Sequence, residues 1–300
     1  MRWEKLGLIY QVSNNHPWML THAANPVAQH IVDDNYRIYF STRDSKRRSS
    51  IAYILININQ PDKVLEVSEN PVLSPGEIGC FDDSGVSMGC ILTVDDEVYL
   101  YYLGWNLGVT VPWRNSIGLA ISKKGRKFER VSRAPVLDRN NNDPFSISYP
   151  YVMQHDGEWH MWYGSNLKWG SEQNDMDHLL KYAVSKDGIK WEPTGDISVN
   201  FNAKNEYAMS KPSVLLENNI YKMWYSYRGD SYRIGYAESL DGVHFDRRDD
   251  LVGIDVSDAG WDSKSIEYPN VFDHKENRYM LYNGNDYGLT GIGMAIQVEK

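Results

Sequence analysis

Carboxylates recur at a nearly fixed distance before a series of tyrosines in this chain of 300 residues. Asp82 and Asp83 precede Tyr102 by twenty and nineteen positions, and Asp143, Glu206 and Asp262 precede Tyr163, Tyr225 and Tyr282 by twenty, nineteen and twenty. Acids that share one position of a repeat are expected at equivalent places in the fold. We therefore expect these side chains to approach one another at a common mouth of the structure.

Paired carboxylates suit the cleavage of glycosidic bonds, because one acid protonates the leaving oxygen while the other activates water or attacks the sugar. We predict that Asp83 and Glu206 form the central acid/base or nucleophile pair, with Asp143 and Asp262 as further catalytic candidates. The alternative is structural. An aspartate in a loop accepts backbone hydrogen bonds and caps a turn, and basic side chains near the same position offer ion pairs.

Further side chains close to this position of the repeat are predicted to bind substrate. A flat indole can cover a sugar face while its N–H bonds to a hydroxyl, although a loop tryptophan can equally fill a gap between elements. Basic groups would suit an anionic sugar. In the first copy Leu20 and Thr21 stand where the other copies carry acids, and His22 and Asn25 come next along the chain. The predicted set is His22, Asn25, Asp82, Trp105, Arg114, Lys211, Arg228, Trp261, Glu267 and Tyr268.

The elements that must position these groups repeat with the acids. Short aromatic segments end at Phe40, Tyr102, Tyr163, Tyr225 and Tyr282, with intervals of 62, 61, 62 and 57 positions. An apolar segment precedes each one, and in every copy but the second it begins with proline, which costs a first strand residue no ladder bond. A third segment follows, and Ser-x-x-Gly turns lead into a fourth in three copies, with Asp-Gly as a strong hairpin signal in two. The repeating unit is therefore predicted to be a four-stranded antiparallel sheet.

Radial repetition of such sheets makes a β-propeller. We predict an all-β, five-bladed propeller in one domain, with blades at about 20–70, 80–137, 143–200, 206–250 and 262–300. The last copy ends after its third strand. Residues 2–10 resemble the missing fourth strand, since Trp3 and Gly7 match Trp191 and Gly195 in spacing. We expect this segment to complete the last blade and close the ring, which protects the edges of an open sheet.

Composition excludes several classes of protein. The net charge of −9 and the isoelectric point near 5.4 disfavour nucleic acid as a partner. Two cysteines cannot form a disulfide scaffold, and no apolar run is long enough for membrane insertion. The N-terminus lacks the apolar segment of a signal peptide, so we expect a cytoplasmic protein. The eight histidines show no metal-binding spacing and there is no glycine-rich phosphate loop, so we expect neither metal nor cofactor.

Several segments together resemble a known group of proteins. They are 81–86 (FDDSGV), 115–120 (NSIGLA), 206–212 (EYAMSKP), 260–263 (GWDS) and 282–285 (YNGN). The chain resembles the five-bladed propeller glycoside hydrolases of families 43, 32, 62 and 68, and most of all a glycosyl-hydrolase-like group encoded among bacterial surface-polysaccharide genes. The resemblance implies a propeller that acts on a carbohydrate or another sugar-containing small molecule.

The chain also departs from those families. Asn25 stands where family 43 enzymes resemble one another in an aspartate that serves as general base, and the family 32 Arg-Asp-Pro and Glu-Cys segments are missing. The resemblance therefore implies the fold more firmly than the mechanism. A noncatalytic carbohydrate-binding protein, or a sugar-transfer protein of surface-polysaccharide biosynthesis, is the alternative to a glycosidase or transglycosidase.

Overall fold

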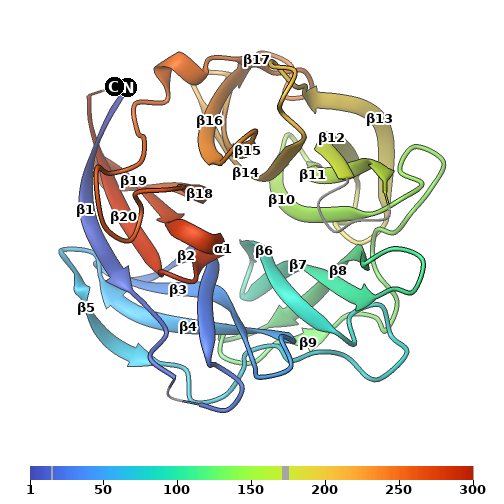
Figure 1. Cartoon of the computed structure of the whole chain (residues 1–300), viewed down its shortest axis with the longest axis horizontal. Helices are drawn as coiled ribbons and strands as arrows, with labels where there is room; N and C mark the ends of the chain where they lie inside the picture. Colours follow the sequence, from blue (N-terminus) through green and yellow to red (C-terminus); the bar gives the residue numbers. More distant parts are fainter. Residues whose placement is uncertain (15, 171–175, 300) are drawn as a thin grey trace.

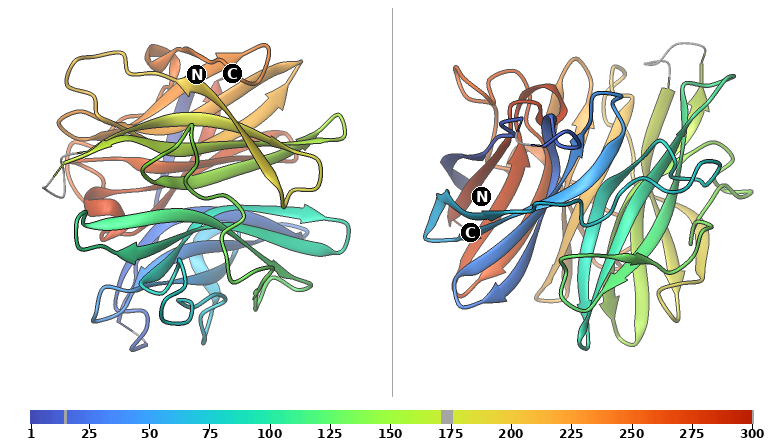
Figure 2. Two further views of the ribbon diagram at one scale, coloured as in Figure 1. Left: turned by 90° about the vertical axis from the view of Figure 1, so that its right-hand side faces the viewer. Right: turned by 90° about the horizontal axis from the view of Figure 1, so that it is seen from below.

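The computed structural model describes residues 1–14, 16–170 and 176–299. The fold is all-β, and its helical segments are the short η1 (Asp249–Leu251) and α1 (Asn285–Gly288). Within the described residues the strands form successive antiparallel meanders arranged around a common axis (Figure 1). In side view the strands run between two faces that carry the turns (Figure 2). No described helix is long and apolar enough to cross a membrane.

Each meander has four strands, as the repeat predicts. The first comprises β2 (Thr21–Val32), β3 (Asn35–Arg43), β4 (Ser49–Asn57) and β5 (Gln60–Val67), and the second β6 (Gly85–Val94), β7 (Glu97–Leu107), β8 (Trp113–Ser122) and β9 (Glu129–Arg130). The third comprises β10 (Ile147–His155), β11 (Glu158–Trp169), β12 (Met176–Ser185) and β13 (Trp191–Val199), and the fourth β14 (Ala208–Glu217), β15 (Ile220–Arg228), β16 (Tyr232–Ser239) and β17 (Asp246–Arg247). The fifth comprises β18 (Glu267–His274), β19 (Asn277–Asn283), β20 (Ile292–Glu299) and β1 (Arg2–Tyr10), which pairs antiparallel with β20.

Apolar side chains fill the spaces between neighbouring meanders. Between the second and third, for example, Tyr101 and Leu119 share a buried cluster with Trp159 and Met161. Alternate residues of each strand point to opposite faces of its sheet. A neighbouring meander packs against each of these faces. This packing explains why the aromatic segments read as strands that are apolar on both faces.

The innermost strands β2, β6, β10, β14 and β18 line the axis (Figure 1), and each contains a β-bulge. The residue before the proline has a left-handed backbone in four of them, with φ of 56° at Asn25, 44° at Tyr149, 53° at Lys211 and 57° at Tyr268. Such conformations are costly for residues other than glycine. A bulge redirects a side chain out of the regular ladder, so these four positions are shaped differently from the rest of the sheet.

Side chains just after the bulges bind three of the innermost strands to the next one. The Cys90 Sγ accepts a hydrogen bond from the backbone N–H of Val152, 3.2 Å away. The Ser213 Oγ accepts one from Val271 at 2.9 Å, and the Asn270 Oδ1 accepts one from Ala28 at 2.8 Å. The last of these bonds connects the fifth meander to the first, so the two ends of the repeat are in direct contact.

Candidate functional site

The repeated acids lie inside the meanders. The Asp143 carboxylate is fully buried and accepts hydrogen bonds from the hydroxyls of Tyr163 at 2.7 Å and Ser165 at 2.6 Å. The Lys181 ammonium lies 3.0 Å from the same carboxylate. All of these residues belong to the third meander, so the charge of Asp143 is balanced within its own sheet.

The other repeated acids have the same kind of partners. Asp82 accepts hydrogen bonds from Tyr102 at 3.0 Å and Arg130 at 2.7 Å. Asp262 accepts them from Tyr282 at 3.1 Å and Lys5 at 2.7 Å.

In the fourth meander two different acids pair with the basic side chain and accept the tyrosine's hydrogen bond. Glu206 pairs with Arg247 at 2.6 Å, and the Tyr225 hydroxyl donates to Asp249 at 2.7 Å. Arg130, Arg247 and Lys5 lie on the outermost strands β9, β17 and β1. Asp82, Asp143, Glu206 and Asp262 thus each bond within their own meander, and in the described chain no hydrogen bond or ion pair joins one of these acids to another at a common mouth.

The first meander shows why an acid and a tyrosine occur together in the other copies. Its aromatic segment ends in Phe40, which has no hydroxyl group, and Met19 lies near the position of the missing acid. Both side chains lie in one buried apolar cluster. Acid and phenol are therefore present together or absent together, as expected when the acid satisfies the buried hydroxyl.

Four other predicted residues have partners in the loops and strands of their own or a neighbouring meander. Asp83 accepts hydrogen bonds from the Gly79 N–H at 2.9 Å and the Asn106 side chain at 2.8 Å. The Trp105 indole N–H donates to the Ser49 Oγ at 2.8 Å. Trp261 stacks on Tyr282 with ring centroids 5.3 Å apart. Arg114 pairs with Asn106 through the backbone of β7 and β8.

Glu267, the first residue of β18, is the carboxyl group at the axis. It is 1% exposed, and burial raises its pKa to about 8. The backbone N–H of Tyr287 and the charge of Arg228 oppose the rise, while Asp286 adds to it. Its Oε1 has no hydrogen-bond partner among the described residues. Glu267 is therefore a largely protonated acid at neutral pH with one oxygen free to bind.

Tyrosines surround this acid from three meanders. Tyr149 of β10 and Tyr268 of β18 come from meanders that are not neighbours, yet their ring centroids are 5.7 Å apart, so they meet across the axis. Tyr232 lies 6.1 Å from Tyr268 and 5.8 Å from Tyr287. Burial raises the pKa of Tyr232 and of Tyr268 well above the usual value, and Glu267 raises both further. These phenols therefore keep their protons as hydrogen-bond donors.

Arg228, at the end of β15, is held flat by the same aromatic groups. Its guanidinium lies 5.5 Å from the ring of Tyr207, 5.3 Å from Tyr232 and 5.8 Å from Tyr287. It donates a hydrogen bond to the Tyr287 hydroxyl, while its Nε is buried without a partner among the described residues. Stacking fixes the plane of the guanidinium and leaves donors for a further group.

His22 and Arg43 complete this cluster from the first meander. Burial lowers the pKa of His22 to about 4, Arg43 lowers it further, and Asp286 opposes the shift. Arg43 also lowers the pKa of Tyr149, which burial raises. His22 is therefore a neutral imidazole near both charges. We call Glu267, Arg228, Tyr149, Tyr232, Tyr268, Tyr287, Asp286, His22 and Arg43 the central cluster.

Unusual backbone conformations gather at this cluster. His22, Tyr149 and Tyr268 have positive φ, and so do Asp286 and Tyr287 at 60° and 59°. The remaining positive-φ residues other than glycine include Asp33, Asp95, Asp156 and Asn219, whose residue types are common in tight turns. Strain carried by bulky residues is typical of functional sites, where the surrounding structure maintains it.

Two more predicted residues lie on the axial strands. Lys211 is 1% exposed, and its ammonium donates to the carbonyl of Gly89 at 2.7 Å. Because Lys211 belongs to the fourth meander and Gly89 to the second, this side chain crosses the axis. Asn25 is buried, and its backbone N–H donates to the Asn283 Oδ1 at 2.8 Å.

Of the residues predicted from the sequence, the structure thus gathers His22, Arg228, Glu267 and Tyr268. The predicted set omits Tyr149, Tyr232, Asp286, Tyr287 and Arg43. One signal was present in the sequence. Tyr149 and Tyr268 hold the same position directly before the strand-opening proline.

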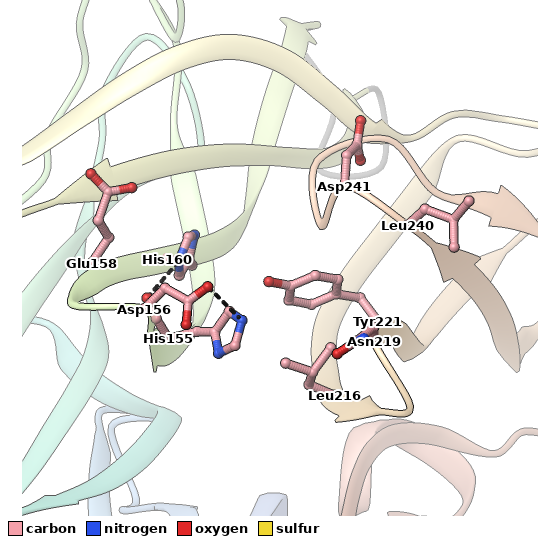
Figure 3. A pocket seen from close by; sticks show the side chains of 9 residues that line it. All are labelled: His155, Asp156, Glu158, His160, Leu216, Asn219, Tyr221, Leu240 and Asp241. Atoms are coloured by element: carbon pink, nitrogen blue, oxygen red, sulfur yellow. Dashed lines mark hydrogen bonds and ion pairs between the residues drawn. The ribbon is translucent and has the colours of Figure 1, made fainter.

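A groove on the opposite face has a different character (Figure 3). It lies between the turns of the third and fourth meanders and is lined by His155, Asp156, Glu158, His160, Leu216, Asn219, Tyr221, Leu240 and Asp241. Two contacts join its lining residues, since His155 lies 3.3 Å from Asp156 and His160 Nε2 lies 3.4 Å from the His155 carbonyl oxygen. No metal-binding group of three or more His, Cys, Asp or Glu side chains occurs in the described part of the chain.

Solved structures define the class of this fold. A glycoside hydrolase matches with a TM-score of 0.77 and 17% identity, covering 99% of this chain and 92% of its own. A structure titled for the GH130 family of mannoside phosphorylases and glycoside hydrolases has a TM-score of 0.72 and 14% identity, covering 98% and 93%. A thermostable family-43 glycoside hydrolase has a TM-score of 0.64 and 16% identity, covering 96% and 91%. The chain has the propeller fold of glycoside-hydrolase-like proteins.

Closer relatives occur in Mycobacterium tuberculosis. The uncharacterised proteins Rv1502 (strain H37Rv) and MT1551 (strain CDC 1551) are each 46% identical over 296 residues, which cover 99% of this chain and 99% of theirs. The chain belongs to the family of these two proteins. No protein-family model matches it.

Proposed function

We propose that this protein acts on a glycosidic bond at the central cluster, with Glu267 as the general acid. The observation that carries the proposal is a buried carboxyl group at the axis whose pKa is raised to about 8 and whose Oε1 has no partner in the described chain. A carboxylic acid that keeps its proton at neutral pH can protonate a leaving sugar oxygen. The glycoside-hydrolase-like fold supports this choice of reaction.

Asp286 is proposed as the second carboxylate. It is exposed, and it lies close enough to Glu267 and His22 to raise the pKa of both. An exposed carboxyl group beside a buried protonated acid matches the two roles in glycoside cleavage, in which the second carboxylate activates water or attacks the sugar. Tyr232 and Tyr268 then offer phenolic donors for sugar hydroxyls, and the exposed rim at Tyr287 offers an aromatic face.

We infer that the meanders are the blades of one five-bladed propeller, formed by the whole chain and closed by the N-terminal strand. The pairing of β1 with β20 and the bond from Ala28 to Asn270 support closure. Such a ring would hold Glu267, Arg228 and His22, which come from three different meanders, in fixed relative positions.

The test is turnover of a panel of aryl glycosides and surface-polysaccharide fragments. Replacing Glu267 by glutamine keeps the size of the side chain and removes its acidic proton, so we expect kcat to fall by about 10²–10⁴-fold. The alkaline limb of the wild-type pH profile should lie near pH 8. Unchanged kcat in Glu267→Gln would remove this assignment.

The repeated acids provide the matched comparison, because their assignment as catalytic groups stays a prediction. Asp83→Asn and Glu206→Gln remove the pair singled out from the sequence, and Asp143→Asn removes a buried carboxylate of similar exposure to Glu267. If these acids are structural, the variants lose stability and keep the wild-type pH profile. A loss of kcat in Asp83→Asn or Glu206→Gln at unchanged stability would instead support the pair.

A noncatalytic sugar-binding or sugar-transfer role in surface-polysaccharide biosynthesis is the alternative. One observation favours it: the acids predicted to act in catalysis are engaged in hydrogen bonds or ion pairs within single meanders. Binding of a glycan without turnover in wild type, and unchanged binding in Glu267→Gln, would support this role.

A further inference from the structure

We propose that the central cluster recognises a sugar that carries an anionic group, and that Arg43 and Arg228 bind that group. The inference rests on the proposed function for its choice of a sugar. Its evidence is separate, because it comes from the arginines and their lack of counter-ions.

Four other buried or half-buried arginines on the strands are matched by carboxylates, whereas Arg37 instead donates to Gln29, Tyr39 and the Lys124 carbonyl. Arg130 pairs with Asp82 at 2.7 Å, Arg247 with Glu206 at 2.6 Å, and Arg278 with Asp273 at 2.7 Å. A guanidinium removed from water needs such a partner, since an unpaired buried charge is costly. The ordinary solution in this fold is therefore an acid within hydrogen-bond distance.

The two arginines of the central cluster lack this solution. Arg228 donates to the neutral hydroxyl of Tyr287, and its Nε is buried without a partner among the described residues. Arg43 is half-buried, and the described chain offers its side chain neither an ion pair nor a hydrogen bond. Their donors are therefore available to a ligand.

The surroundings leave the positive charge largely uncompensated. Glu267 adds no negative charge while it keeps its proton, and His22 adds no positive charge while neutral. Asp286 is the other acidic side chain near both of these groups, so two arginines face one aspartate. A carboxylate or phosphate ester on a sugar would balance the charge and fit the planar fork of Arg228.

The positions of the two arginines would set the orientation of the bound sugar. Arg228 comes from the fourth meander, and Arg43 from the first, beside Tyr149 and His22. Glu267 of the fifth meander lies close to Arg228. An anionic group held by these arginines places the rest of the sugar next to the protonated acid, so recognition and chemistry share one end of the axis.

The test is direct binding, measured by calorimetry at pH 7 with glucuronate, galacturonate and glucose 6-phosphate against glucose and galactose. We expect the anionic sugars to bind at least about tenfold more tightly than the neutral ones. Arg43→Met should lower affinity for the anionic sugars about tenfold and leave neutral sugars unchanged. Arg43→Lys should recover part of the loss.

Arg139→Met serves as the matched control, because Arg139 is exposed and lies outside the central cluster. Arg228→Met is the second variant, and the unpaired Arg43 keeps the test decisive if Arg228→Met fails to fold. Equal binding of neutral and anionic sugars, no measurable binding of either, or loss of affinity only in Arg139→Met overturns the inference. Preferential anion binding without any turnover would instead uphold it and count against the proposed hydrolysis.

Discussion

Two sets of buried carboxyl groups in this protein lie in opposite electrostatic settings. Asp143 has a lysine and two hydroxyls within hydrogen-bond distance, and equivalent pairs recur in the second and fifth meanders. Glu267 has no equivalent in the repeat and is shielded by tyrosines, and its pKa is raised to about 8. The repeated acids are paired within their own sheets, whereas the acid that departs from the repeat is the one that we propose for chemistry.

The largest effect is expected at the Asp143–Lys181 pair, which tests whether a paired acid stabilises its sheet. Lys181→Met leaves a carboxylate with no exposed surface without its counter-ion, and breaking a buried pair typically costs about 3–5 kcal/mol. Urea unfolding at pH 7 measures the loss. The double variant Asp143→Leu/Lys181→Met should cost much less than the two single changes together. A loss below about 1 kcal/mol in Lys181→Met would show that the pair does not hold this sheet.

The axial acid predicts a pH dependence that the paired acids lack. Because the pKa of Glu267 is raised from 4.5 to about 8 on folding, the folded state binds a proton that the unfolded state releases between these values. Stability from this group is therefore complete below pH 4.5 and is lost as pH rises towards 8, by as much as about 4 kcal/mol. The difference in unfolding free energy between wild type and Glu267→Gln should shift across this window. A constant difference from pH 4.5 to 8 would contradict the assigned environment.

Lys211 should give a slope of the opposite sign. Burial lowers its pKa from 10.5 to about 8, and Cys90 partly offsets the shift. The unfolded state then binds more protons between pH 8 and 10.5, so wild-type stability rises across that window by about 2–3 kcal/mol. Lys211→Met should remove this rise, which denaturant unfolding at pH 7.5 and 10.5 would detect. An identical rise in both proteins would assign it to another group.

The smallest effect is expected at the tyrosine hydroxyls of the repeat. Tyr163→Phe removes one of several hydrogen bonds to Asp143, and we expect a loss of about 1 kcal/mol with unchanged turnover. Phe40 in the first meander shows that the fold accepts a ring without the hydroxyl when an apolar side chain lies in the acid's place. Thermal unfolding and kcat measured on the same preparation separate an effect on stability from an effect on turnover. A fall in kcat at unchanged stability would support a catalytic role for Asp143.

The strands could be predicted from the sequence because the residue types that favour them recur locally in each copy. Aromatic and β-branched residues, strand-opening prolines and Ser-x-x-Gly turns recur at each copy, and the pairing of residues 2–10 with the last strand follows from the same pattern. The repeated acids were located correctly in the repeat, but their position across the sheet depends on where the connecting loops run. Those loops arrive from the outermost strand of the preceding meander and bring each acid to partners in the meander that follows.

The central cluster was less accessible to sequence reasoning. Counting back from the tyrosine anchors selects residues that share a position, whereas Asp286 and Tyr287 lie in one loop with no counterpart in the other copies. Their closeness to Glu267 depends on a strained backbone that residue types do not specify. The absence of an acid before Phe40 was readable from the chain alone, and it already indicated that acid and hydroxyl belong together.

The bond from Lys211 to the carbonyl of Gly89 has a consequence for how a ligand could reach the central cluster. This side chain reaches from the fourth meander to the second and so lies across the axis. Under the proposed function, a glycan would approach the central cluster from the side of Tyr287 and would be bound by one end.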